Sequence, residues 1–188
     1  PNGGFFGSGN GIITSKGRIA FVAALRTEAK WGGRMDNVLV YSDDKGATWQ
    51  ASPVARANGD ESKVIELSNG DLLISSRNRA GGANARTFVL SHDHGQTWSE
   101  PKTWPELMGN ACNAALTRYS SERTKGEKNI LLHTLLESPH RDHLRIYMSE
   151  DEGKTWSLGK TVCDGEAAYS EVTRLKNGNV GIISEEND

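Results

Sequence analysis

Short apolar stretches joined by polar turns recur along the 188 residues, and helical spacing of apolar residues is hard to find. Three segments share one form, in which an apolar stretch meets a Lys-Gly or Asn-Gly turn and a second apolar stretch follows. They are residues 11–24, 64–77 and 172–185. A fourth segment, 114–136, has the same form with a longer connection. This form is typical of β-hairpins, so the pattern predicts an all-β protein.

A polar octapeptide, Ser-x-Asp-x-Gly-x-Thr-Trp, occurs between the hairpins at residues 42–49, 91–98 and 149–156. Asp and Gly suit a tight turn, and the Ser and Thr hydroxyls can bind its backbone. The large Trp side chain can fill the space between neighbouring units. We therefore interpret the octapeptide as scaffold and not as a catalytic centre.

Hairpins and octapeptides together make a repeating unit of about four strands. Gly17 and Gly70 are 53 residues apart, and Trp49 and Trp98 are 49 apart. A four-stranded unit of this period is typical of a β-propeller blade, and propellers close with about 4 to 8 blades. The hairpins and octapeptides make only about three and a half blades. We therefore expect the 188 residues to be part of a longer protein.

Composition excludes several function classes. The chain has 22 Lys and Arg against 24 Asp and Glu, well mixed, for a formal net charge of −2. This balance predicts no binding of nucleic acid or of an anionic membrane, and no apolar run approaches the roughly 18 residues of a membrane span. Cys112 and Cys163 are expected to be buried free thiols. Neither they nor His140 and His143 have the spacing of a metal site.

Ionisable residues occupy matching positions in two hairpins, nine residues before and seven residues after the turn glycine. They are Glu61 and Arg77 in one hairpin and Tyr169 and Glu185 in the other, each pair 16 residues apart. The first hairpin has Ala24 at the later position, so the fold does not require a charge there. Because matching positions of propeller blades meet around one axis, we expect these side chains to lie near a common centre.

The octapeptide resembles the Asp box of sialidases and of several unrelated propellers. Residues 59–78, 141–156 and 165–185 also resemble sialidase segments, in the family's order. The chain is thus similar to exo-α-sialidases (neuraminidases) with Asp-box (BNR) repeats. The resemblance implies an all-β, six-bladed β-propeller of sialidase type. Residues 1–188 would be a partial catalytic propeller that holds its central and later blades.

The resemblance also implies a role for each ionisable residue. Tyr169 takes the place of the nucleophile and Glu61 that of its general base. Arg77 and Arg141 match two arginines that bind the substrate carboxylate, and Glu185 matches the acid that positions a further arginine. That arginine, in a family motif Arg-Ile-Pro, and the acid/base Asp that follows it are absent from this sequence.

The residue types suit a sugar whose anomeric carbon carries a carboxylate. That charge would repel a carboxylate nucleophile but not a neutral phenol, which an adjacent Glu can activate by accepting its proton. Planar guanidinium groups donate two parallel bonds to a carboxylate. Two further residues are candidates for substrate contact: Arg34, spaced from its octapeptide as Arg141 is, and Asn113, which could bind the glycerol chain of the substrate.

The expected partners are therefore sialylated glycans on glycoproteins, glycolipids or oligosaccharides, and the mechanism needs no cofactor and no metal. The resemblance favours a secreted or cell-surface location over a lysosomal or cytoplasmic one, which stays open. Two alternatives stay open. A trans-sialidase, which passes the sialyl group to a sugar or closes it on itself, would use the same residues. A non-catalytic Asp-box propeller that acts as a lectin or interaction module would need only the octapeptides.

Overall fold

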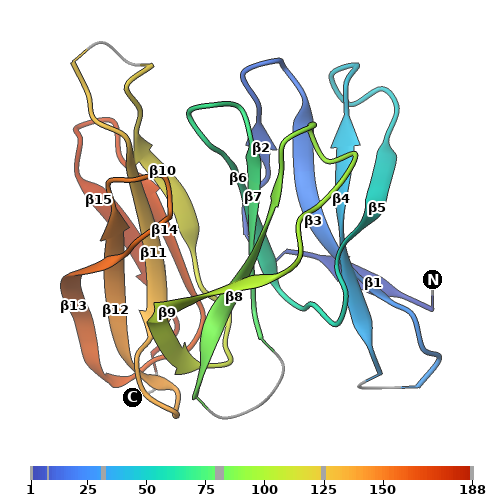
Figure 1. Cartoon of the computed structure of the whole chain (residues 1–188). Coiled ribbons are helices and arrows are strands. Elements are labelled where there is room, and N and C mark those ends of the chain that lie inside the picture. The colour runs from blue at the N-terminus through green and yellow to red at the C-terminus, as the bar shows by residue number, and fades with distance from the viewer. Residues whose placement is uncertain (1, 8, 31–32, 79–82, 124–125, 187–188) are drawn as a thin grey trace. The chain divides into compact units, whose positions relative to one another are not determined.

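The computed structural model describes residues 2–7, 9–30, 33–78, 83–123 and 126–186 (Figure 1). Within these ranges the regular structure consists of β-strands, which pair antiparallel. The chain divides into two compact units. Unit 1 contains Pro1–Arg79 and Thr87–Lys102, and unit 2 contains Ala80–Arg86 and Thr103–Asp188. The predicted all-β fold is confirmed.

The strands form three larger sheets and one separate hairpin. The first sheet contains β1 (Gly4–Phe6), β2 (Ile12–Ile13), β3 (Ile19–Arg26), β4 (Met35–Ser42) and β5 (Gln50–Arg56). The second contains β6 (Ser62–Glu66), β7 (Leu72–Ser76), β8 (Ala83–Ser91) and β9 (Lys102–Asn110). The third contains β10 (Leu116–Ser120), β11 (Ile130–Leu136), β12 (Asp142–Ser149) and β13 (Ser157–Glu166), and the hairpin contains β14 (Ser170–Arg174) and β15 (Val180–Ser184).

These sheets have the construction expected of propeller blades. In each larger sheet the main strands pair in sequence order, as β6-β7-β8-β9 and β10-β11-β12-β13 do. In the first sheet the order is β1-β3-β4-β5, and β2 also pairs with β3. Three sheets and one hairpin agree with the three and a half blades that the repeats predict.

The hairpin turns depend on glycine. Gly17, Gly70 and Gly178 have φ values of 85°, 93° and 85°, in the left-handed region that other residues rarely adopt. Each glycine N–H donates to the carbonyl of the residue three positions earlier, at 2.8 to 2.9 Å. A β-carbon would meet nothing within 4 Å at these three positions. The backbone conformation and not a lack of space therefore requires glycine.

The octapeptide closes on itself through side-chain bonds. In the second copy, the Ser91 hydroxyl accepts from Gly95 N at 2.6 Å and donates to Asp93 Oδ1 at 2.8 Å. Asp93 in turn accepts from Thr97 N at 2.8 Å and from the Thr97 hydroxyl at 2.5 Å. The same bonds occur in the other two copies. The scaffold interpretation explains every polar side chain of the motif.

The tryptophans of the octapeptides differ in burial. Trp98 packs against the apolar cluster of unit 1, which includes Leu39 of the first sheet and Leu72 of the second. Trp156 is buried in unit 2 and meets Trp104 edge to face, with ring centroids 5.4 Å apart. Trp49 is 46% exposed. The prediction that the Trp side chain fills the space between neighbouring units therefore holds for Trp98 and Trp156, but it does not describe Trp49.

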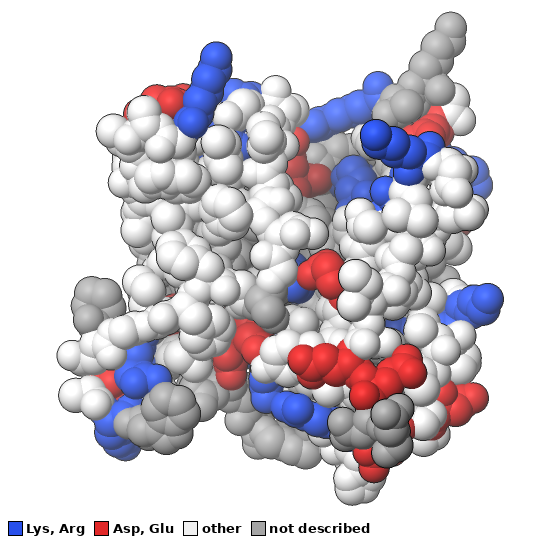
Figure 2. Space-filling model, turned by 180° about the vertical axis from the view of Figure 1, so that it is seen from behind, with Lys and Arg blue, Asp and Glu red and all other residues white. Residues whose placement is uncertain are grey.

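The two cysteines are free thiols, as expected. Cys112 is buried, whereas Cys163 is only partly buried because it lies on β13, a strand at the edge of its sheet. Within the described residues, no helix has the length and apolarity needed to cross a membrane. Figure 2 shows that acidic and basic side chains are mixed on one face of the molecule and are interspersed with uncharged surface.

Candidate active site

Two hairpins hold four of the predicted site residues at equivalent positions. In β6–β7, Ser62 is the partner of Ser76, and one residue farther out Arg77 N donates to the Glu61 carbonyl at 2.9 Å. In β14–β15, Glu185 N donates to the Tyr169 carbonyl at 2.8 Å. Each predicted pair therefore faces across the open end of its own hairpin. The 16-residue spacing in the sequence is the length of chain that joins these two facing positions.

Glu61 and Arg77 of unit 1 form an ion pair that is largely shielded from solvent. Arg77 Nη1 donates to Glu61 Oε2 at 2.7 Å, and the two side chains are 21% and 10% exposed. Asp60 lies close by, with Oδ2 4.0 Å from Arg77 Nε and Oδ1 accepting from Glu61 N at 2.8 Å. The guanidinium thus lies close to two carboxylates. Asp60 was not among the sequence candidates, although it directly precedes Glu61.

Tyr169 and Arg141 come together in unit 2. The Arg141 Cζ lies 5.7 Å from the centroid of the Tyr169 ring, within the range of a cation–π contact. The Arg141 carbonyl accepts from Ala167 N at 2.9 Å, which ties the loop of Arg141 to the segment before Tyr169. The Tyr169 ring packs against an apolar cluster that includes Leu136 and Leu144, so it is half-buried.

Glu185 and Asn113 both contact the backbone around Tyr169. Glu185 is exposed, and its Oε2 accepts from Tyr169 N at 3.3 Å. Asn113 is buried, and its Nδ2 donates to the Ser170 carbonyl at 3.3 Å. The Ser170 hydroxyl is 2.8 Å from that of Thr134 on β11. Asn113 therefore holds the start of β14, and its contact with a substrate glycerol chain stays a prediction.

Side-chain bonds brace the loop that carries Arg141. His143 has a φ of 55°, and its Nδ1 lies 2.8 Å from Asp142 Oδ1. The Ser138 hydroxyl also donates to Asp142. The bond from Ser138, together with that from His143, lowers the pKa of Asp142. Among the described residues, no group of three or more His, Cys, Asp or Glu side chains gathers in a metal-binding arrangement.

Arg34 has a partner close to it in the sequence. Its Nε and Nη2 donate to the two carboxylate oxygens of Asp36, at 2.9 and 3.2 Å. Asp36 is buried, and it also accepts from Asn58 N at 2.8 Å. This geometry gives Arg34 a role in holding the loop after β5. A role in substrate binding stays a prediction.

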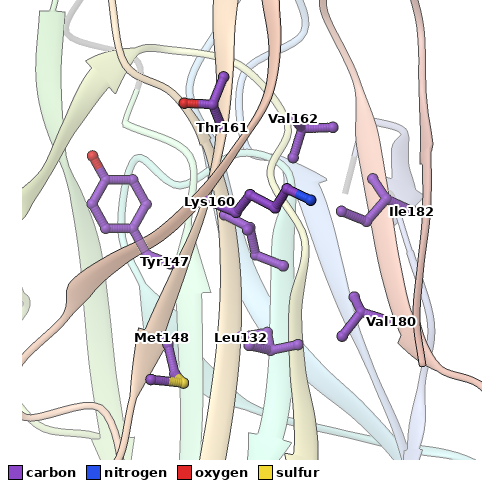
Figure 3. Close-up of a pocket in the computed structure, with 10 residues that line it drawn as sticks. Leu132, Tyr147, Met148, Lys160, Thr161, Val162, Val180 and Ile182 are labelled. Carbon is purple, nitrogen blue, oxygen red and sulfur yellow. The ribbon is translucent and has the colours of Figure 1, made fainter. Parts of the chain in front are cut away.

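A cavity of about 420 Å³ in unit 2 offers different chemistry. It is lined by β11, β12, β13 and β15, and none of the predicted site residues borders it. In Figure 3, Val180 and Ile182 lie across from Tyr147 and Met148, with Lys160 between them. Apart from Tyr147, Lys160 and Thr161 its lining is apolar, and it offers no guanidinium group for a bidentate bond to a carboxylate.

The predicted residues thus form two groups. Glu61 and Arg77 belong to unit 1, whereas Arg141, Tyr169, Glu185 and Asn113 belong to unit 2. Each group is brought together within its own unit. The convergence of both groups on one centre stays a prediction.

Comparison with known proteins gives consistent matches. Residues 5–182 match the family described as BNR repeat-like domain. A sialidase of Micromonospora viridifaciens is 32% identical over 156 residues, which cover 81% of this chain and 24% of that protein. The structure of the Hadza microbial sialidase Hz136 is similar, with a TM-score of 0.84 and 28% identity over 97% of this chain and 35% of that one.

The structure of Trypanosoma rangeli sialidase in complex with 2,3-difluorosialic acid, described as a covalent intermediate, has a TM-score of 0.73. It is 24% identical, and the match covers 94% of this chain and 28% of that one, so it bears on the fold alone. The chain spans about a quarter to a third of the length of these proteins. The matching folds are β-propellers, in agreement with the repeating sheets of the present chain.

Proposed function

Since the chain belongs to the family of sialidases with BNR repeats, we propose that it forms part of the catalytic propeller of an exo-α-sialidase. The enzyme would release terminal sialic acid from glycoproteins, glycolipids or oligosaccharides, with retention of configuration. Tyr169 would be the nucleophile and Glu61 its general base. Arg77 and Arg141 would bind the substrate carboxylate.

The observation that carries the proposal is the placement of two ionisable pairs at equivalent open ends of two hairpins. One pair presents a carboxylate and a guanidinium, Glu61 and Arg77, joined at 2.7 Å. The other places a phenol and a carboxylate on facing residues, Tyr169 and Glu185, with the guanidinium of Arg141 5.7 Å from the phenol ring. These are the groups that the hydrolysis of an acidic ketoside needs, and scaffold alone requires none of them.

The proposed reaction has two displacement steps. In the first, the Tyr169 oxygen attacks the anomeric carbon and forms a C–O bond while Glu61 accepts the phenolic proton. The bond to the aglycone breaks, and its oxygen takes a proton from an acid that the assigned residues do not include. In the second, water attacks the same carbon and gives a proton to the conjugate base of that acid, while Tyr169 leaves with the proton returned by Glu61. Two inversions give retention.

Arg77 and Arg141 suit the carboxylate of the substrate for different reasons. Arg77 is held by Glu61, so its planar group is fixed before a ligand arrives. Arg141 is exposed and lies at the Tyr169 ring, where it can bring the carboxylate beside the nucleophile. Each charge-assisted bond contributes about 1.5–3 kcal/mol net.

The test uses Tyr169→Phe in the intact protein, including any sequence that flanks these 188 residues. Hydrolysis of a fluorogenic α-sialoside should fall by about 100-fold or more, because a nucleophile that acts in concert with its base is lost. Tyr119→Phe is the matched control. Its hydroxyl binds the Gly178 carbonyl at the turn end of the same hairpin, and its loss should leave turnover intact. Activity of Tyr169→Phe within a few-fold of the parent would refute the assignment.

Product analysis separates hydrolysis from its alternatives. With a sialoside alone and again with added lactose, the proposal predicts free sialic acid in both reactions. Sialyl-lactose as the main product in the second reaction would identify a transferase. An anhydro sugar without lactose would identify intramolecular transfer. Binding of sialosides without turnover would instead support the lectin.

A further inference from the structure

A single buried amide lies beneath the open end of the β6–β7 hairpin. Asn37, on β4 of the first sheet, is 0% exposed. Its Nδ2 donates to the Asp60 carbonyl at 2.7 Å. Its Oδ1 accepts from the hydroxyls of Ser62 at 3.0 Å and Ser76 at 2.8 Å. One side chain of a neighbouring sheet therefore holds three points of the hairpin.

Those three points surround the proposed base and its arginine. Two of them immediately precede and follow Glu61, and the third immediately precedes Arg77. Gly59 allows this approach, because a β-carbon there would lie 1.8 Å from Asn37 Oδ1. The amide of Asn37 binds the Asp60 carbonyl and the Ser62 and Ser76 hydroxyls, so it would act on the two ionisable groups through the residues beside them.

The other hairpin is held in a different way. At its open end Ser170 receives two separate contacts, from the Asn113 amide at 3.3 Å and from the Thr134 hydroxyl at 2.8 Å. These two contacts come from separate side chains, whereas Asn37 alone binds three points of the β6–β7 hairpin. The two hairpin ends are therefore held in different ways.

We propose that Asn37 is a positioning residue that fixes Glu61 and Arg77 relative to each other for the sialidase reaction. This inference rests on the proposed function. A buried amide bonded at both its donor and acceptor ends makes its surroundings rigid, because every alternative arrangement leaves a polar group without a partner. A displacement of about 1 Å at a catalytic group can cost about 100-fold in rate.

The first variants are Asn37→Ala, which removes all three contacts, and Asn37→Asp, which keeps the size and the acceptors but loses the donor to the Asp60 carbonyl. In the intact protein, Asn37→Ala should lower kcat by about 10- to 100-fold. Asn37→Asp should lower it less.

The matched control is Ser52→Ala. Ser52 is also a buried polar residue of the first sheet, and its hydroxyl accepts from Leu39 N at 3.0 Å and donates to the Pro53 carbonyl at 2.7 Å. Neither contact involves residues 60–62 or 76–77. Ser52→Ala should lower the unfolding temperature and leave kcat within about twofold of the parent.

The decisive readout is a double-mutant cycle with Glu61→Gln. If Asn37 acts by positioning Glu61, its loss should change kcat by less than about threefold once the base is absent. If Asn37 only stabilises the fold, the fold-reductions in kcat caused by Asn37→Ala and by Glu61→Gln should multiply in the double variant. Two results would overturn the inference and leave the proposed function standing. One is fold-reductions in kcat that multiply, and the other is an Asn37→Ala enzyme with kcat within about twofold of the parent, as expected of Ser52→Ala.

Two other outcomes are also informative. A parent protein without any sialoside hydrolysis would overturn the proposed function and this inference with it. If Asn37→Ala does not fold, Ser62→Ala takes its place in the cycle, since it removes one of the three contacts and leaves the amide. Its smaller loss of kcat must vanish in the Glu61→Gln background, and a loss that persists there would overturn the inference.

Discussion

The open ends of the β6–β7 and β14–β15 hairpins have the same backbone and different chemistry. In both, a residue one position beyond the last strand pair donates its N–H to the residue opposite, at 2.9 Å in one and 2.8 Å in the other. In β6–β7 the facing side chains, Glu61 and Arg77, are largely buried and joined. In β14–β15 Tyr169 is half-buried by apolar packing, and Glu185 is exposed.

This difference shows which parts of a repeat are free to vary. The turn ends are nearly identical, with a left-handed glycine and the same bond in each of three hairpins. The octapeptides also keep the same bonds in each copy. The open ends of the two hairpins carry different ionisable groups and are held by different contacts. In this chain the scaffold repeats and the chemistry does not.

Removing the acid at the open end of β6–β7 should give the largest fall in kcat. Glu61→Gln keeps the size of the side chain but abolishes the base, so kcat should fall by about 10²- to 10⁴-fold. Steady-state kinetics with a fluorogenic sialoside measures this effect. A Glu61→Gln enzyme that retains most of its kcat would contradict the assignment of Glu61 as base.

Removing the two arginines in turn should separate binding from stability. Arg77→Ala and Arg141→Ala should each raise KM by about 10- to 100-fold through lost bonds to the carboxylate. Only Arg77→Ala should also destabilise the fold, by about 1–3 kcal/mol, because it removes the ion pair with Glu61, whose side chain is largely shielded from solvent. Urea unfolding of both variants measures this change in the free energy of unfolding. Equal unfolding free energies would show that the buried pair is not what distinguishes the two hairpins.

Acid should weaken the octapeptides. The Thr48 hydroxyl and backbone hold the pKa of Asp44 at about 2, and Thr97 does the same for Asp93. These pKa values lie below those of the unfolded chain, near about 4. The stabilisation is therefore complete above about pH 4 and is lost as pH falls toward 2.

The measurement is the unfolding midpoint of the parent and of Asp93→Asn between pH 7 and pH 2. The midpoint of the parent should fall more steeply in acid than that of Asp93→Asn, because the variant has one fewer carboxylate to protonate. Parallel curves would mean that the bonds of Asp93 do not contribute to this pH dependence.

The smallest expected effect is that of Glu185→Gln. Glu185 is exposed, and its bond to Tyr169 N is 3.3 Å long, so the free energy of unfolding should change by less than about 0.5 kcal/mol. KM should rise by no more than about fivefold, as expected for an exposed charge. Thermal unfolding and steady-state kinetics check both values. If Glu185→Gln lowered the free energy of unfolding and raised KM as much as Arg77→Ala, the two open ends would not differ in the way described.

Local sequence predicted the repeating parts of the molecule well. The Lys-Gly and Asn-Gly turns marked the hairpins, because positive φ restricts the residue at Gly17, Gly70 and Gly178. The period of the repeats predicted the blades. Spacing from the turn glycine located Glu61 opposite Arg77, since antiparallel pairing fixes which residues face each other.

Contacts between distant segments were not predictable in the same way. Asn37 lies in an ordinary strand sequence, and its role arises from partners 23, 25 and 39 residues away. The bond of the Asn113 amide to the Ser170 carbonyl, 57 residues away, was not predicted either. Trp49 has the same local sequence as Trp98 but lies 46% exposed. In each case burial depends on a neighbouring sheet, which the local pattern does not specify.

The most direct test of the account is to identify the residue that becomes covalently sialylated. The intact protein is treated with 2,3-difluorosialic acid, so that attack by the nucleophile displaces fluoride from the anomeric carbon, and the labelled peptide is located by mass spectrometry. The account predicts a fluorosialyl group on Tyr169 and none in Tyr169→Phe. An adduct on a carboxylate such as Glu61, or sialoside turnover with Tyr169 unlabelled, would contradict it.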